Sequence, residues 1–261
     1  MIPFFRKIRK KMADDNRPLK YMRYAIGEIV LVVFGILIAL QINNWNENEK
    51  LRVRETNLLK ELKTNLNTNI KNLEKDIEVQ IKQVSFIDIV QLHLENKKPY
   101  NDSISYFISY GSPAPDVLLT SSAFETLRSS GLELIRSDTL RQAIINLFEV
   151  DYPYLFQETK RLEDQVWPAV VVPMIQKHFR FRDNLAIPTN YEALLKDDEF
   201  LNMWSFRGEL RKGSTSRKII AVEKTQAVIK LIEKELNKID KLNKLLSYIQ
   251  CFEDNKSERS C

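Results

Sequence analysis

The stretch that decides the fold is Tyr24-Ala-Ile-Gly-Glu-Ile-Val-Leu-Val-Val-Phe-Gly-Ile-Leu-Ile-Ala-Leu-Gln-Ile42, in which only Glu28 and Gln41 are strongly polar. As an α-helix this stretch would be about 28 Å long, close to the roughly 30 Å hydrocarbon core of a lipid bilayer. Trp45, just beyond it, is an amphipathic aromatic residue of the kind enriched at membrane interfaces. The sequence therefore predicts one transmembrane helix over residues 24–45.

Charged residues on either side of this stretch predict its orientation. Eight Lys and Arg residues precede Tyr24, and the next basic residue after the stretch is Lys50. Because positive residues stay on the cytoplasmic side, we expect residues 1–23 to form a cytoplasmic basic leader. A cleaved signal peptide would have a shorter apolar region and a small-residue cleavage site, which Ala39-Leu40-Gln41 does not resemble. We therefore expect an anchor that is retained.

The charge balance differs between the two ends of the chain. Residues 1–45 hold eight basic and three acidic residues, and the remaining residues hold 32 of each sign. The net charge of +5 thus belongs to the leader and the predicted span. A main domain without net positive charge lacks the electrostatic signature of nucleic-acid binding, so we expect no nucleic-acid partner.

One run of residues resembles a known family. The run 25–46, Ala-Ile-Gly-Glu-Ile-Val-Leu-Val followed by Gly-Ile-Leu-Ile-Ala-Leu-Gln-Ile-Asn-Asn-Trp-Asn, is similar to the N-terminal signature of an uncharacterised family of bacterial single-span membrane proteins. A weaker similarity covers Ser122–Gly131, with Leu140 following. The resemblance implies a bacterial inner (cytoplasmic) membrane protein whose main domain lies on the periplasmic side. It implies no activity, cofactor or site.

The rest of the chain reads as helices. Residues 46–250 are predicted to form an extracytoplasmic α-helical domain, and residues 251–261 a flexible tail. Glu47–Glu95 contains no Pro or Gly, and its apolar residues recur in steps of 3, 4, 4, 3, 4, 4 and 3 at Leu59, Leu62, Leu66, Ile70, Leu73, Ile77, Ile81 and Val84. This eleven-residue repeat predicts one long helix that would coil slightly right-handed if paired, either with its own domain or with a second copy.

A second long helix is predicted near the C-terminus, over residues 215–249. Its apolar residues Ile229, Ile232, Leu236, Ile239 and Leu246 lie near heptad spacing, as in coiled coils. The predicted fold class is all-α, with one N-terminal transmembrane helix continuing into an elongated extracytoplasmic helical bundle.

Shorter elements are predicted between the two long helices. Ser122 and Glu125 have the spacing of a capping box for a helix that ends at Gly131, and Ser137 is placed to cap the next helix. Val170-Val171-Val172 would suit a strand or a helix, and Pro168 and Pro173 are expected to kink or end a helix there. Gly208 and Gly213 are expected to separate a helix over 197–206 from the last long helix.

Residues that carry chemistry are sparse. His93 and His178 are far apart, and Cys251 and Cys261 lie in the polar tail, where a disulfide between them is permitted but not required. No metal-binding, phosphate-binding or nucleophile motif is present. We therefore expect no enzyme activity, no cofactor and no metal. A group of aromatic residues either lines a pocket or, as the favoured interpretation, packs in the core: Tyr152, Tyr154, Phe156, Trp167, Phe179 and Phe181.

Glu28 is the one ionisable residue inside the predicted span. On a helix, Gly35 and Ala39 fall within about 20° of it, and small residues four apart allow a second helix to approach closely. Glu28, Gly35 and Ala39 are therefore a candidate transmembrane contact face. The alternative, which we favour, is that Glu28 lies near the cytoplasmic interface and reaches towards the basic leader.

These features favour an interaction or scaffold module anchored in the lipid bilayer. Its expected partner is a second copy, as a homo-oligomer, or another envelope protein. The alternative is a ligand-sensing subunit that signals through a membrane partner. An exposed apolar stripe on a packed domain would favour the first function, and a deep polar pocket would favour the second.

Overall fold

The computed structural model describes residues 18–113 and 117–257, so most of the predicted leader and the end of the predicted tail lie outside the described residues. The regular elements in these ranges are helices apart from one short hairpin, which confirms the all-α fold class. The chain divides into two compact units, 1–55 and 56–261.

One helix, α2 (Pro18–Glu95), contains both the predicted span and the long helix predicted after it. No Pro or Gly occurs between Ile36 and Glu95, so nothing in this part of the sequence interrupts the backbone hydrogen bonds. The helix ends where predicted: Lys97 takes a left-handed conformation with φ of 49°, and Pro99 follows.

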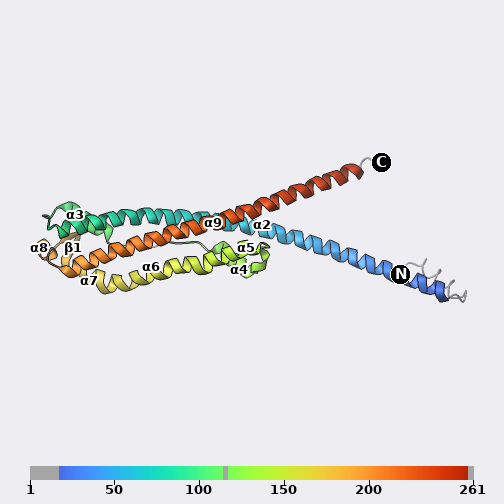
Figure 1. The fold of residues 1–261 in the computed structure, drawn as a ribbon, viewed down its shortest axis with the longest axis horizontal. Helices are drawn as coiled ribbons and strands as arrows, with labels where there is room; N and C mark the ends of the chain where they lie inside the picture. The colour runs from blue at the N-terminus through green and yellow to red at the C-terminus, as the bar shows by residue number, and fades with distance from the viewer. Residues whose placement is uncertain (1–17, 114–116, 258–261) are drawn as a thin grey trace. The chain divides into compact units, whose positions relative to one another are not determined.

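The second unit surrounds its part of α2 with shorter elements and one more long helix. After α2 come α3 (Asp102–Gly111), α4 (Ser122–Ser130), the 3₁₀ turn η1 (Leu132–Leu134), α5 (Asp138–Asn146), the π-helical η2 (Leu147–Asp151), α6 (Tyr152–Val166), the π-helical η3 (Trp167–Val171) and α7 (Val172–His178). They are followed by β1 (Phe179–Arg182), β2 (Leu185–Pro188), α8 (Tyr191–Leu194) and α9 (Asp198–Ser257). In this unit α9 runs antiparallel to α2, and α6 packs along α9 (Figure 1).

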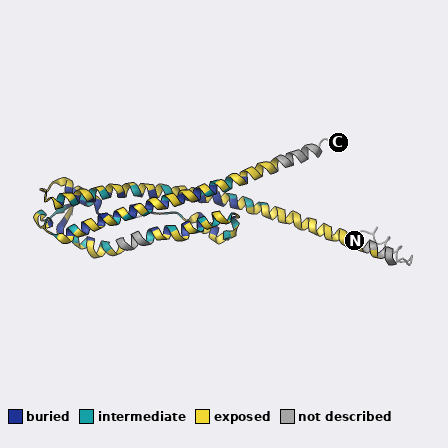
Figure 2. Cartoon of the chain, in the orientation of Figure 1, coloured by how far each residue is buried: buried dark blue, intermediate teal, exposed yellow. Residues whose placement is uncertain are grey.

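The interior of the second unit is divided along its length. A first apolar cluster gathers residues such as Leu59 and Leu66 of α2, Phe124 of α4 and Ile232 of α9. A second apolar cluster gathers Ile87 and Val90 of α2, Ile104 and Ile108 of α3, Phe179 of β1, and Phe200 and Trp204 of α9. Buried positions follow the facing sides of α2 and α9 (Figure 2). Between the two clusters lie a small group around Leu73 and several buried polar residues.

Side chains of α2 hold an extended segment against the bundle. Asn69 donates from Nδ2 to the carbonyl of Thr120 at 3.0 Å and accepts the Thr120 N–H at 2.7 Å. Asn72 donates to the carbonyl of Leu118 at 2.9 Å. Asn65 accepts from the hydroxyl of Ser122 at 2.9 Å, so Ser122 does not form the predicted capping box. Asparagine amides thus supply the backbone partners that an extended segment lacks.

Other local predictions have mixed outcomes. Ser137 caps α5 by accepting the N–H of Leu140 at 3.4 Å, as predicted. Gly208 and Gly213 do not end a helix, because α9 runs through both and buries Gly208 against Ile87. Val170–Val172 is helical rather than a strand.

The strands of the described structure come after α7, as β1 and β2, and not at residues 170–172. β1 and β2 pair antiparallel around Asp183 and Asn184. Pro168 lies in the π-helical η3 and Pro173 in the first turn of α7, and the helical run continues from α6 through η3 into α7, so neither proline ends it.

Candidate functional sites

The apolar part of α2 in the first unit is fully accessible. Every large apolar side chain between Ile26 and Ile42 is exposed, by 45% to 73%. Among the described residues this is the single helix long and apolar enough to cross a membrane. An accessible apolar surface of this length suits contact with lipid.

The three residues of the candidate contact face all lie on this helix. Glu28 is half-buried, Gly35 and Ala39 are exposed, and no heavy atom lies within 4 Å of a Cβ placed at Gly35. Because α2 is helical throughout, the three residues share one side of it. Close approach of a second helix at this side stays a prediction.

A second accessible apolar surface lies where α3 packs on α2. We define the α2–α3 patch as Phe86, Ile89, Tyr106 and Tyr110. The ring of Phe86 lies 5.8 Å from that of Tyr106, which lies 4.5 Å from that of Tyr110. Ile89, Tyr106 and Tyr110 are 42%, 44% and 47% exposed. Aromatic side chains combining apolar rings and polar tips are typical of protein–protein interfaces.

Buried residues of α2 repeat every seven residues in the second unit. Steps of three and four connect Leu59, Leu62, Leu66, Asn69, Leu73, Asp76, Gln80, Gln83, Ile87, Val90 and Leu94. This is the spacing of helices that pack side by side. The predicted eleven-residue repeat is therefore wrong: it included Ile81, which is 53% exposed, and passed over the buried Gln80.

The middle of this buried face is polar. We define the polar segment as Asp76, Gln80 and Gln83 of α2 with Arg207, Arg211, Thr215 and Lys218 of α9. Lys218 donates to the carboxylate of Asp76, and their side chains are 4% and 7% exposed. Thr215 donates to Oε1 of Gln80 at 3.1 Å. These contacts join the two long helices across the core, where ion pairs need close geometry to offset desolvation.

The two arginines of the polar segment hold the loop after α3. Arg207 donates to the carbonyl of Ser112, and Arg211 donates to the carbonyl of Pro113 at 2.8 Å. Gln83 also donates to the Pro113 carbonyl, at 2.9 Å. The guanidinium of Arg207 lies 5.1 Å from the ring centre of Trp167, a cation–π distance. The two arginine side chains therefore hold the backbone of this loop in place.

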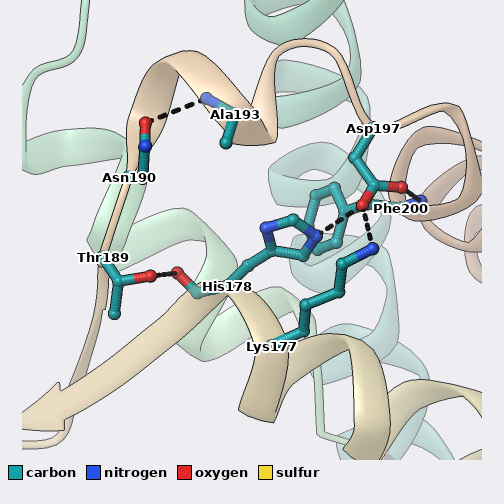
Figure 3. A network of polar contacts seen from close by, with 7 residues as sticks. All are labelled: Lys177, His178, Thr189, Asn190, Ala193, Asp197 and Phe200. Atoms are coloured by element: carbon teal, nitrogen blue, oxygen red, sulfur yellow. Dashed lines mark hydrogen bonds and ion pairs between the residues drawn. The ribbon is translucent and has the colours of Figure 1, made fainter.

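A histidine, a lysine and an aspartate meet where α9 begins (Figure 3). His178 Nε2 donates to Oδ2 of Asp197 at 2.8 Å, and Lys177 donates to the same oxygen at 2.5 Å. The other carboxylate oxygen, Oδ1, accepts the N–H of Phe200 at 3.0 Å and so caps α9. The Lys177 ammonium and the Phe200 N–H hold the pKa of Asp197 well below its usual range.

The contacts of His178 connect several elements of the fold. The imidazole of His178 is buried, and its ring centre lies 5.6 Å from that of Phe200. The backbone carbonyl of His178 accepts from the N–H of Thr189 at 2.8 Å. His178 thereby ties α7, the hairpin and α9 together.

The remaining candidate residues are dispersed. His93 contacts the Pro99 carbonyl at 3.0 Å, and no cluster of potential metal ligands occurs within 18–113 and 117–257. Of the six aromatic residues, four pack in or against apolar clusters, namely Tyr152, Phe156, Trp167 and Phe179, whereas Tyr154 and Phe181 are exposed. They do not line one pocket. The side chains of Cys251 and Cys261 lie outside the described ones.

The sequence matches one family profile. Residues 28–207 match the family of unknown function DUF6090, which covers most of the chain. No curated protein and no solved structure matches it. The expected similarity to an uncharacterised family is thereby confirmed.

Proposed function

We propose that this chain, a member of the DUF6090 family, is a membrane-anchored helical interaction module. The accessible apolar part of α2 supports the anchor, because its length suits a bilayer and its large apolar side chains are exposed. The proposed role requires no catalytic residue.

The proposed orientation places the N-terminus in the cytoplasm and the second unit outside it. The excess of basic residues before Tyr24 supports this orientation. The equal numbers of acidic and basic residues after residue 45 are compatible with export, and the inner membrane of a bacterium is the proposed location.

The α2–α3 patch is the observation that supports interaction as the function. Two tyrosines and an isoleucine are each more than 40% exposed around a shared aromatic contact, so several exposed apolar side chains lie together on this surface. Contiguous apolar surface of this kind marks interaction sites more often than isolated exposed residues do. The proposed partner is a second copy or another membrane-associated protein.

Photo-crosslinking in native membranes tests this function. Tyr110 replaced by benzoylphenylalanine should give a protein adduct on illumination, since the new aromatic ring keeps the position of the old one. Tyr154, which is 59% exposed on α6, carries the same replacement as a matched control and should give no adduct. Equal yields at the two positions, or none at Tyr110, would contradict the proposal.

A further inference from the structure

The hairpin of β1 and β2 has one covered edge and one open edge. Its register places Arg182 opposite Leu185, Phe181 opposite Ala186 and Arg180 opposite Ile187. The N–H of Ala186 points away from β1 and donates to the hydroxyl of Ser109 on α3 at 2.7 Å. The edge of β2 is therefore satisfied by α3.

The same register fixes the direction of the Phe181 backbone. In an antiparallel pair, two opposite residues either exchange both hydrogen bonds or direct both N–H and C=O groups outwards. Since Ala186 directs its N–H outwards, Phe181 directs its N–H and C=O away from β2. Within the described ranges, no residue hydrogen-bonds to these two groups.

Side chains on this open edge have a defined pattern. Phe181 is 63% exposed and, by strand alternation, shares a side of β1 with the buried Phe179. Arg180 and Arg182 are exposed on the opposite side, and neither forms an ion pair with a described residue. Asp183 is the only acid between residues 179 and 190.

We propose that the open edge of β1 binds an extended segment of a partner, in which acidic residues alternate with apolar ones. The backbone groups of Phe181 would pair with the added strand, as in other cases of β-strand addition. Acidic side chains would face Arg180 and Arg182, and apolar side chains would cover Phe181. A second copy is a poor occupant, because antiparallel pairing of β1 with itself sets arginines against arginines.

This inference rests on the proposed interaction function and gives it a partner chemistry. A capped peptide of alternating glutamate and valine is the probe, titrated into the full chain in detergent micelles. We expect saturable binding that weakens as salt increases, because exposed charges are screened. The same peptide with lysine in place of glutamate should not bind.

Methylated peptides test the strand pairing directly. Directly opposed residues have side chains on one side of a sheet, so the residue that pairs with Phe181 is a valine. N-methylation of the valines should abolish binding, whereas N-methylation of the glutamates, whose N–H groups face away from β1, should leave it intact. Equal binding of both methylated peptides would overturn strand addition.

Protein variants separate this site from others. Arg180→Glu with Arg182→Glu should weaken binding about tenfold or more, by reversing two cross-strand charge pairs. Arg128→Glu, on the exposed surface of α4, is the matched control and should bind as the wild type does. Phe181→Ala should also weaken binding. No binding of the glutamate peptide would remove the β1 site and leave the Tyr110 crosslink unaffected.

Discussion

At the scale of single residues, the ion pair between Asp76 and Lys218 has the largest predicted effect on stability. Both side chains are almost fully buried. Lys218→Met shortens the side chain by one atom and leaves the carboxylate of Asp76 without its cation. Breaking a buried pair in this way costs about 3–5 kcal/mol. Urea unfolding followed by circular dichroism, on the protein in detergent, measures the loss.

Two controls interpret that measurement. Asp76→Leu with Lys218→Leu removes both charges, and its stability should return to the wild-type value or exceed it. Lys82→Met removes an exposed partner of Glu78 and should change the free energy of unfolding by less than about 1 kcal/mol. A double variant as unstable as Lys218→Met alone would show that the packing, and not the buried charge, determines the loss.

Asp197 predicts a dependence of stability on pH. Its pKa is lowered in the folded chain, chiefly by the hydrogen bond from Lys177, so it favours folding above the ordinary carboxyl pKa of about 3.9. That contribution is lost as the pH falls below this value towards the folded pKa. The difference in unfolding free energy between wild type and Asp197→Asn should be constant near neutral pH and shrink in acid. A difference that grows in acid would contradict this account.

At the scale of elements, α2 illustrates which of its features could be predicted from the sequence and which could not. Its continuity from Ile36 onward follows from the absence of Pro and Gly there, and its end at Glu95, shortly before Pro99, was also predicted. Its buried side was predicted only as far as Leu73. Beyond that point the polar Asp76, Gln80 and Gln83 take the heptad positions. Apolar spacing cannot reveal a buried face whose members are polar, because their burial depends on partners far away in the sequence, such as Lys218.

The hairpin and the joint at α9 were missed for different reasons. Phe179 and Phe181 alternate before Asp183-Asn184, and both turn residues have positive φ, a recognisable signal for a two-residue hairpin turn. The contact of His178 with Asp197 joins residues 19 apart that no motif links. The contacts of Asn65, Asn69 and Asn72 likewise join residues 46 to 58 apart in the sequence, and no motif links them.

The transmembrane part of α2 carries a prediction of its own. Gly35→Leu should abolish association of the span, because a larger side chain blocks close approach of a second helix. Val30→Leu, on the opposite side of the helix, should have no effect. Glu28→Gln keeps a hydrogen-bonding group, worth about 0.6–2 kcal/mol between membrane helices, and should retain most of the association.

An association assay restricted to the transmembrane segment compares these variants. Equal signals from wild type and Gly35→Leu would leave residues 24–45 as a plain anchor. Glu28 would then be assigned to the membrane interface.

At the scale of the whole molecule, the proposed topology is the most direct prediction. A reporter that is active only outside the cytoplasm, fused after Cys261, should be active, because one span separates the basic leader from the second unit. A reporter active only in the cytoplasm, fused at the same position, should be silent. The reverse pattern would contradict both the orientation and the proposed location of the interaction surface.

The polar segment also separates two apolar clusters whose unfolding spectroscopy can follow independently. Of the three tryptophans, Trp167 and Trp204 lie at the second apolar cluster, and the first cluster contains none. Tryptophan fluorescence therefore follows one end of the second unit, while far-ultraviolet circular dichroism follows all of its helices. If the buried charges weaken cooperation between the two ends, the two signals will change at different urea concentrations. A protein that unfolds as a single cooperative unit will give superimposable curves.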